Sequence, residues 1–236
     1  MNPLLVALDV NTAPEAFALA DMLRGVAGGF KVGSRLFTAE GTSIVSRLVE
    51  RGDRVFLDLK FHDIPSTVAG AVEAATRLGV WMVNVHASGG ADMMRAAKAA
   101  AEETSAKRSL TVPLVIAVTV LTSLEQDTLA RLGVAEGVEQ HVDRLAHLAC
   151  DAGLDGVVAS PREIAPIRAW ADRRFLVVTP GIRAGERSDD QARTATAIEA
   201  LHAGASYLVV GRPIIKAADP RAAAGRMVEE IGASGQ

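Results

Sequence analysis

Short runs of apolar, often β-branched residues recur along the whole chain. They lack a clean alternation of apolar and polar positions, which is typical of strands covered on both faces. The pattern predicts eight such strands: LLVALDV (4–10), GFKVGS (29–34), RVFLDLKF (54–61), MVNVHAS (82–88), LVIAVTV (114–120), GVVAS (156–160), FLVVTPGI (175–182) and YLVVGRPI (207–214).

The segments between these runs have helical spacing and are rich in Ala, Leu and Glu, as in Pro14–Val26 and Val138–Ala152. AEGTSIVSRLVERG ends in Gly52, a residue favoured just after a helix. A strand followed by a helix, repeated eight times without a linker, predicts a single-domain TIM (β/α)8 barrel over residues 1–236. A doubly wound sheet is the competing fold, but no G-x-G-x-x-G motif follows the first strand.

Composition narrows the class of protein. The chain is 49% hydrophobic, and its 25 basic and 28 acidic residues give a formal charge of −3. This balance argues against nucleic acid or a membrane surface as partner. Cys150 is the only cysteine, so an internal disulfide and a CxxC-type zinc site are excluded. The N-terminus has no secretory pattern and no apolar run is long enough to span a bilayer, so we expect a cytoplasmic protein.

Barrel enzymes place their active sites at the C-terminal ends of the strands. Asp58 and Lys60 are two apart in one predicted strand and should share a face, whereas Asp63 follows in the turn. A structural ion pair is the simpler interpretation, but a second strand-end lysine, Lys31, favours an active site. The polar residues at the predicted strand ends are Asp9, Lys31, Asp58, Lys60, His86, Thr119, Thr122, Ser160, Thr179, Arg183 and Arg212.

The loops after the last two predicted strands indicate a phosphate-binding site. The loops after these strands commonly bind phosphate in this fold, and here they contain TPGIR (179–183) and GRPI (211–214). Gly211 allows the backbone to approach a ligand closely, and the guanidinium of Arg212 can form two hydrogen bonds to a phosphate. The polar segment 183–193 is either a plain surface loop or a lid over the phosphate, with Gln191 placed to reach inward.

With these residues in hand, the sequence resembles the orotidine 5′-phosphate decarboxylase family in its bacterial form. The motif D-x-K-x-x-D-I-[GP]-x-T is present without a gap between Asp58 and Thr67. Other family features follow in order along nearly the whole chain: ALD at Asp9, FKVG at Lys31, VHASGG at His86, LTS at Thr122, SP at Ser160, TPGIR, DDQ at Gln191 and GRPI at Arg212.

The resemblance implies a homodimer with shared active sites, in which Asp63, Ile64 and Thr67 complete the site of the partner subunit. It implies decarboxylation of orotidine 5′-monophosphate to UMP and CO2, without metal or organic cofactor. Lys60 would be the proton donor, in a charge row with Lys31, Asp58 and the partner's Asp63. The expected substrate contacts are Asp9 and Lys31 for the ribose, Thr122 and Ser160 for the pyrimidine, and Pro180, Arg183, Gln191, Gly211 and Arg212 around the phosphate.

Three other functions compete with this one. Magnesium-dependent sugar-phosphate decarboxylases and aldolases share the barrel and the D-x-K-x-x-D row, but they typically carry a metal-binding Glu where this chain has Lys31. A catalytically silent barrel that serves as a binding module predicts loss of a charged site residue, and none is missing. A nucleic-acid binder fits the charge balance poorly.

Overall fold

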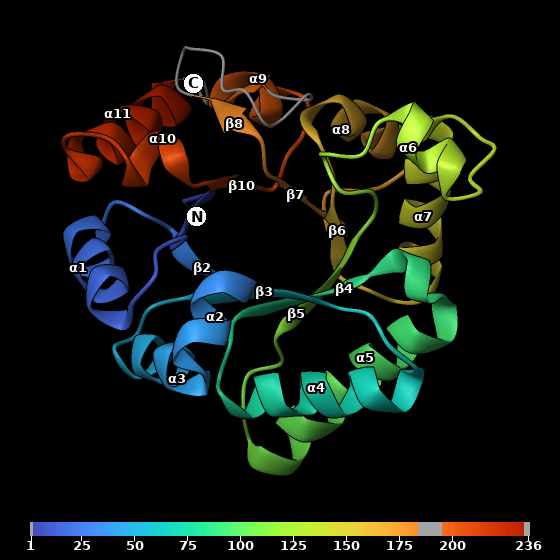
Figure 1. The fold of residues 1–236 in the computed structure, drawn as a ribbon, viewed down its shortest axis with the longest axis horizontal. Coiled ribbons are helices and arrows are strands. Elements are labelled where there is room, and N and C mark those ends of the chain that lie inside the picture. The colour runs from blue at the N-terminus through green and yellow to red at the C-terminus, as the bar shows by residue number, and fades with distance from the viewer. Residues whose placement is uncertain (1, 184–194, 234–236) are drawn as a thin grey trace.

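The computed structural model describes residues 2–183 and 195–233 and forms a closed barrel of parallel strands ringed by helices (Figure 1). The strands are neighbours in the order β1-β10-β7-β6-β5-β4-β3-β2, which closes the sheet on itself and confirms the predicted TIM barrel. Their bounds are β1 (Leu4–Ala7), β2 (Gly29–Gly33), β3 (Val55–Phe61), β4 (Met82–His86), β5 (Leu114–Val118), β6 (Gly156–Val158), β7 (Leu176–Thr179) and β10 (Tyr207–Val210).

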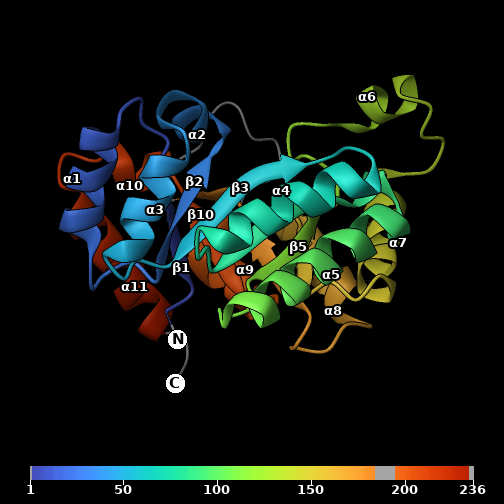
Figure 2. The same cartoon turned by 90° about the horizontal axis from the view of Figure 1, so that it is seen from below.

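Helices cover the outside of the barrel, and α6 stands out from the main body in the side view (Figure 2). Of the described helices, none is both long enough and apolar enough to cross a membrane. The α-helices are α1 (Ala13–Leu23), α2 (Ser34–Glu40), α3 (Thr42–Glu50), α4 (Pro65–Arg77), α5 (Ala91–Arg108), α6 (Gln126–Arg131), α7 (Val138–Asp151), α8 (Ile164–Arg168), α9 (Ala197–His202), α10 (Arg212–Ile215) and α11 (Pro220–Ala233); the short 3-10 turns are η1 (Ala87–Gly89) and η2 (Pro161–Glu163).

All eight observed strands are shorter than predicted, and the last two barrel strands differ most from the prediction. The predicted strand over residues 207–214 ends at Val210, because Gly211 caps the short helix α10 and Pro213 lies in its first turn. Proline has no N–H to donate to a sheet but suits the start of a helix. The run 175–182 likewise ends as β7 at Thr179. Ile182 belongs to a separate short strand, β8 (Ile182–Arg183), which pairs with β9 (Ala195–Thr196).

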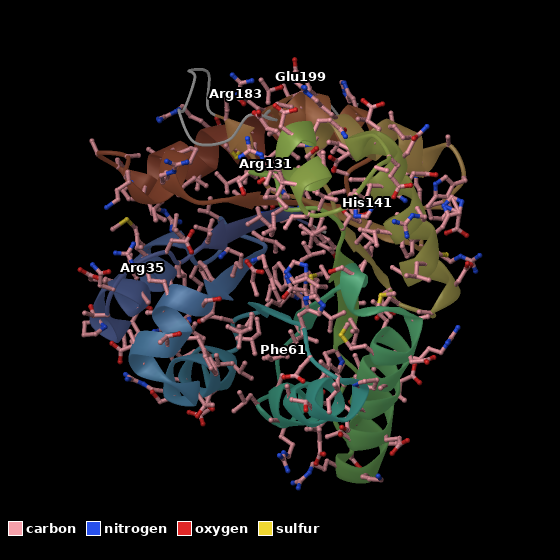
Figure 3. All side chains as sticks on the ribbon, turned by 45° about the vertical axis from the view of Figure 1, so that its right-hand side comes forward. Arg35, Phe61, Arg131, His141, Arg183 and Glu199 are labelled. Atoms are coloured by element: carbon pink, nitrogen blue, oxygen red, sulfur yellow. The ribbon has the colours of Figure 1, made fainter. Side chains whose placement is uncertain are left out.

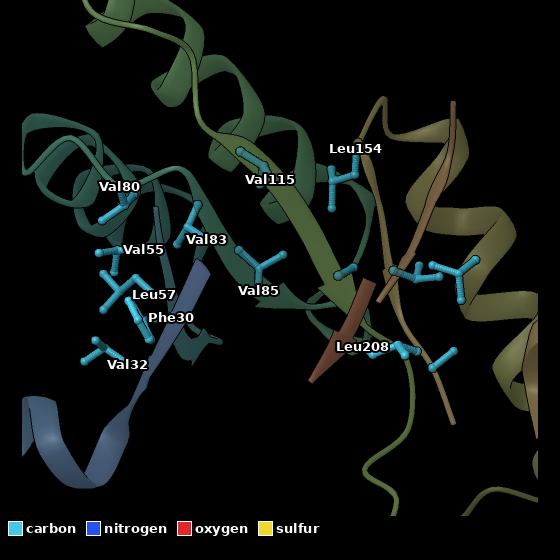
Figure 4. Close-up of a cluster of buried hydrophobic side chains, with 14 of the residues drawn as sticks. Phe30, Val32, Val55, Leu57, Val80, Val83, Val85, Val115, Leu154 and Leu208 are labelled. Atoms are coloured by element: carbon cyan, nitrogen blue, oxygen red, sulfur yellow. The ribbon is translucent and has the colours of Figure 1, made fainter. Parts of the chain in front are cut away.

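Apolar side chains form two layers, one inside the barrel and one between the barrel and its helices. Successive residues of a strand alternate between these layers: Leu4 and Val6 pack outward, whereas Leu5 and Ala7 belong to the inner cluster. Figure 4 shows part of the outer layer. The inner cluster fills part of the barrel interior; its buried members are Leu5, Ala7, Phe56, Met82, Ile116, Val178 and Val209.

Candidate active site

A cavity of about 540 Å³ opens where the barrel strands end. Its apolar lining includes Ala7, Phe56 and Val209, which also belong to the inner cluster of the barrel. Most of the residues predicted from the sequence lie around this one cavity. Those that line it are Asp9, Lys31, Asp58, Lys60, Thr122, Pro180, Arg183, Gly211 and Arg212.

Four of these side chains form a continuous row of alternating charge. The Lys31 Nζ lies 3.2 Å from Asp9 Oδ1 and 3.3 Å from Asp58 Oδ2, and the Lys60 Nζ lies 2.5 Å from Asp58 Oδ1. The side chains of Lys31 and Asp58 are each only 10% exposed, whereas that of Lys60 is 34% exposed. The row is therefore anchored in the barrel at Lys31 and Asp58, and its two ends, Asp9 and Lys60, are both accessible to solvent.

Asp58 remains ionised because its neighbours outweigh its burial. Burial alone raises the pKa of this carboxyl, but the charges of Lys31 and Lys60 and the hydrogen bonds from Lys60 and Asn84 bring its pKa below the ordinary value. The Asp58 carboxylate therefore lies between the Lys31 and Lys60 side chains, with N–O distances of 3.3 and 2.5 Å. The row is thus a fixed electrostatic feature of the cavity.

The local structure of β3 differs from the regular strand that the sequence pattern predicts. Lys60 has a φ of 54°, a left-handed conformation that costs a non-glycine residue of order 1–3 kcal/mol. The sheet register shifts at the same point, between Leu57 and Phe61. Asp58 and Lys60 do share the cavity side, as predicted, but their contact depends on this irregular backbone.

Asn84 of β4 is a site residue that the sequence analysis missed. Its side chain is fully buried, donates to Asp58 Oδ1 at 2.7 Å, and accepts from the backbone N–H of Lys60 at 2.8 Å. The sequence feature that indicates this role is a single Asn within the otherwise apolar start of MVNVH, because a buried polar group needs a hydrogen-bond partner.

Room for the Lys31 ammonium depends on Gly33. A Cβ at position 33 would lie 2.9 Å from Lys31 Nζ, so any larger residue would displace the lysine. Gly181, in the loop before β8, has a φ of 79° and permits the turn that follows Pro180. At this rim Arg183 lies near Glu199 of α9 (Figure 3), whose pKa is lowered first by hydrogen bonding to Thr196 and also by the Arg183 charge.

Three predicted residues lie outside the cavity of their own chain. Asp63, Ile64 and Thr67 are exposed at the start of α4, and 64% of Ile64 is accessible to solvent. The Asp63 carboxylate accepts a hydrogen bond from the Ile64 N–H at 2.6 Å, so it turns toward its own loop rather than toward Lys60. The geometry leaves these side chains free to meet another molecule.

Ser160 is fully buried next to the lining residue Ala159 but does not itself line the cavity, and its hydroxyl has no hydrogen-bond partner among the described residues. Gln191 lies outside the described residues. Within the described ranges, no group of three or more His, Cys, Asp or Glu side chains is arranged to hold a metal ion.

His86 and His62 lie beside the row, with ring centroids 5.5 Å apart. Burial lowers the pKa of His86, and the positive charges of His62 and Lys60 lower it further, against an opposing effect of Asp58. The unfolded chain therefore binds a proton at His86 more readily than the folded chain does. Stability is lost as the pH falls below the pKa of about 6.5 that histidine has in an unfolded chain.

We expect His86→Gln to flatten this part of the pH dependence of the unfolding free energy, measured by urea denaturation at a series of pH values. The same slope in both proteins would contradict the expectation.

An eight-stranded barrel with a partly buried charge row and a glycine–arginine loop at its C-terminal mouth belongs to the class of TIM-barrel enzymes. The family model for orotidine 5′-phosphate decarboxylase / HUMPS matches residues 2–227. The chain belongs to this family, as the sequence resemblance predicted.

Individual relatives agree with the family assignment. The chain is 54% identical over 232 residues to orotidine 5′-phosphate decarboxylase of Moorella thermoacetica (98% of this chain, 92% of the relative), and 51% identical over 231 residues to that of Chromobacterium violaceum (98% and 92%). The crystal structure of orotidine 5′-phosphate decarboxylase from Lactobacillus acidophilus superposes with a TM-score of 0.88 at 35% identity, over 98% of this chain and 99% of that one. The expected assignment to the carboxy-lyases of this family is confirmed by these relatives.

Proposed function

We propose that this chain decarboxylates orotidine 5′-monophosphate to UMP and CO2, the last step of de novo pyrimidine nucleotide synthesis. The observation that supports it most is the charge row that ends in the partly exposed Lys60 ammonium, 2.5 Å from the Asp58 carboxylate. Membership of the decarboxylase family and the presence of the whole D-x-K-x-x-D motif support the same substrate.

The reaction breaks the bond between C6 of the pyrimidine and its carboxylate, and the electron pair stays on C6 as CO2 leaves. The resulting carbanion has poor resonance stabilisation, so a fixed positive charge beside C6 lowers the barrier. One charge pair at about 4 Å, with an effective dielectric constant near 20, contributes roughly 4 kcal/mol. Lys60 supplies this charge and then delivers a proton from Nζ to C6 as general acid.

The rest of the row orients Lys60 and the ribose. Asp58 faces the carboxylate of the substrate and fixes the position of the Lys60 ammonium, whose Nζ lies 2.5 Å from Asp58 Oδ1. Lys31 fixes Asp58 from the opposite side at 3.3 Å. Lys31 and Asp9, which are joined at 3.2 Å, hold the ribose hydroxyls.

The opposite side of the cavity binds the phosphate and the base. The backbone of Gly211 and the guanidinium of Arg212 hold the phosphate, with Pro180 and Arg183 beside them; all four line the cavity. Thr122 and Ser160 address the pyrimidine edge, and Gln191 bridges phosphate and base. Binding energy from the remote phosphate is thereby available to raise the rate of the chemical step.

The active unit in this proposal is a homodimer with shared sites. Asp63, Ile64 and Thr67 reach into the cavity of the partner subunit, where Asp63 extends the charge row. Their exposure and their absence from their own cavity support this role. A cytoplasmic location stays a prediction.

The reaction as proposed requires neither metal nor organic cofactor. The magnesium-dependent sugar-phosphate enzymes are the main alternative, and they typically use a carboxylate at the position of Lys31. An ammonium there, 3.3 Å from Asp58, repels a divalent cation and occupies the carboxylate that would bind it.

The proposed activity is tested by adding purified protein to orotidine 5′-monophosphate and following the loss of its ultraviolet absorbance. The expected product is UMP, with one CO2 released per substrate consumed. Absence of UMP from a folded protein would contradict the proposed substrate.

A further inference from the structure

The register between β3 and β4 is irregular beside the charge row. Leu57 pairs with Val83, and the next pair is Phe61 with Val85. Between these pairs β3 contains Asp58, Leu59 and Lys60, whereas β4 contains Asn84 alone. We call residues 58–60 the β3 bulge. A bulge of this kind leaves backbone groups without ladder partners and redirects side chains, and bulges are over-represented next to active sites.

The Asn84 side chain replaces the ladder that the β3 bulge interrupts. Its Oδ1 accepts the N–H of Lys60 at 2.8 Å, and its Nδ2 donates to Asp58 Oδ1 at 2.7 Å. That same Asp58 oxygen receives the Lys60 Nζ at 2.5 Å. Asn84 thus contacts both catalytic residues, at the backbone of one and at the carboxylate of the other.

The amide of Asn84 supplies both the acceptor and the donor that these contacts require. The Oδ1 faces a donor and the Nδ2 faces a carboxylate, so the orientation of the amide is fixed by its partners. Asn84 is fully buried, which leaves its partners without access to solvent from that side. Without it, the Lys60 N–H loses its acceptor at the residue where the backbone has a φ of 54°.

We propose that Asn84 is a positioning residue, which holds the β3 bulge in the conformation that directs the Lys60 ammonium and the Asp58 carboxylate into the cavity. It acts through these two residues and does not touch the substrate. The kinetic part of its test rests on the proposed function, whereas the structural part does not.

Asn84→Ala and Asn84→Leu remove both hydrogen bonds, and the leucine keeps the branched skeleton of the side chain in case the alanine variant does not fold. We expect kcat for orotidine 5′-monophosphate to fall about 100-fold, because small misplacements of catalytic groups have effects of that order. KM should change by less than about threefold, since ribose and phosphate contacts lie elsewhere. Kinetics and unfolding by urea are measured on the same preparations.

Val83→Ala is the matched control, because Val83 precedes Asn84 in β4, is equally buried, and packs in the outer layer away from the cavity. It should lower stability while kcat stays at the value of the unaltered protein. Unchanged kcat in the folded Asn84 variant would overturn the proposal, and so would an equal loss of kcat in Val83→Ala.

Crystal structures of the unaltered protein and the Asn84 variant give a readout that does not depend on the substrate. The variant should show a changed backbone at Lys60 and a displaced Nζ, and an unchanged β3 bulge would overturn the proposal. If the unaltered protein does not convert orotidine 5′-monophosphate, the proposed function fails, and the two crystal structures alone decide the role of Asn84.

Discussion

Replacing Lys60 by alanine is expected to abolish turnover while leaving the binding of UMP or another substrate analogue largely intact. Loss of a charge worth roughly 4 kcal/mol corresponds to a rate about 10³-fold lower. Loss of the proton donor adds a further factor of about 10² to 10⁴. The analogue is held mainly by ribose and phosphate contacts, which this change leaves in place. Single-turnover rates and the dissociation constant of the analogue measure the two effects separately.

Lys98→Ala provides the matched control for this experiment. Lys98 is also a partly buried lysine in a close ion pair, with its Nζ 2.7 Å from Asp155, but it does not line the cavity. Its removal should lower stability and leave kcat unchanged. Preserved activity in Lys60→Ala would remove Lys60 from its proposed role. An equal loss in Lys98→Ala would attribute the effect to stability instead.

The second large effect is expected from mixing two inactive proteins. Lys60→Ala and Asp63→Ala should each be nearly inactive as pure homodimers, because every site lacks one member of the row. In a hybrid dimer one site contains both changes and the other contains neither. Free exchange of equal amounts should therefore restore about a quarter of the activity of the unaltered dimer, because half of the dimers are hybrids with one intact site of two.

Subunit exchange must be shown independently, for example by mass spectrometry of a tagged and an untagged chain. Activity should appear at the rate of exchange and should require both variants. No recovery after demonstrated exchange would contradict the shared site, and Asp63 would then act within its own chain or not at all. The exposed position of Asp63 beside Ile64 makes the shared site the expected result.

The barrel could be predicted from sequence because each strand is a short apolar run that is covered on both faces. The charge row followed from the fold, since the C-terminal ends of parallel strands meet at one mouth. Lys31, Asp58 and Lys60 are indeed joined there, at distances of 3.3 and 2.5 Å. The structure departs from the prediction in both phosphate loops, because Arg212 begins α10 instead of extending β10 and Ile182 belongs to β8 instead of extending β7.

The role of Asn84 could not be predicted because it depends on the register between two strands. Sequence periodicity assumes regular pairing, in which Lys60 would donate to the backbone of β4. The register shift between Leu57 and Phe61 removes that backbone acceptor. The Lys60 N–H donates instead to the side chain of Asn84 in β4. Similarly, Ser160 is buried at the N-cap of η2 and outside the cavity lining, and no local pattern encodes this burial.

The most direct test of the account is conversion of orotidine 5′-monophosphate by the purified protein in excess EDTA, followed as loss of ultraviolet absorbance. Rapid formation of UMP is predicted, because the Lys60 ammonium and not a metal ion stabilises the charge at C6. This result would also exclude the magnesium-dependent enzymes that share the D-x-K-x-x-D row. No turnover in EDTA by a folded, dimeric protein would contradict the account, and the charge row would then serve another phosphorylated substrate.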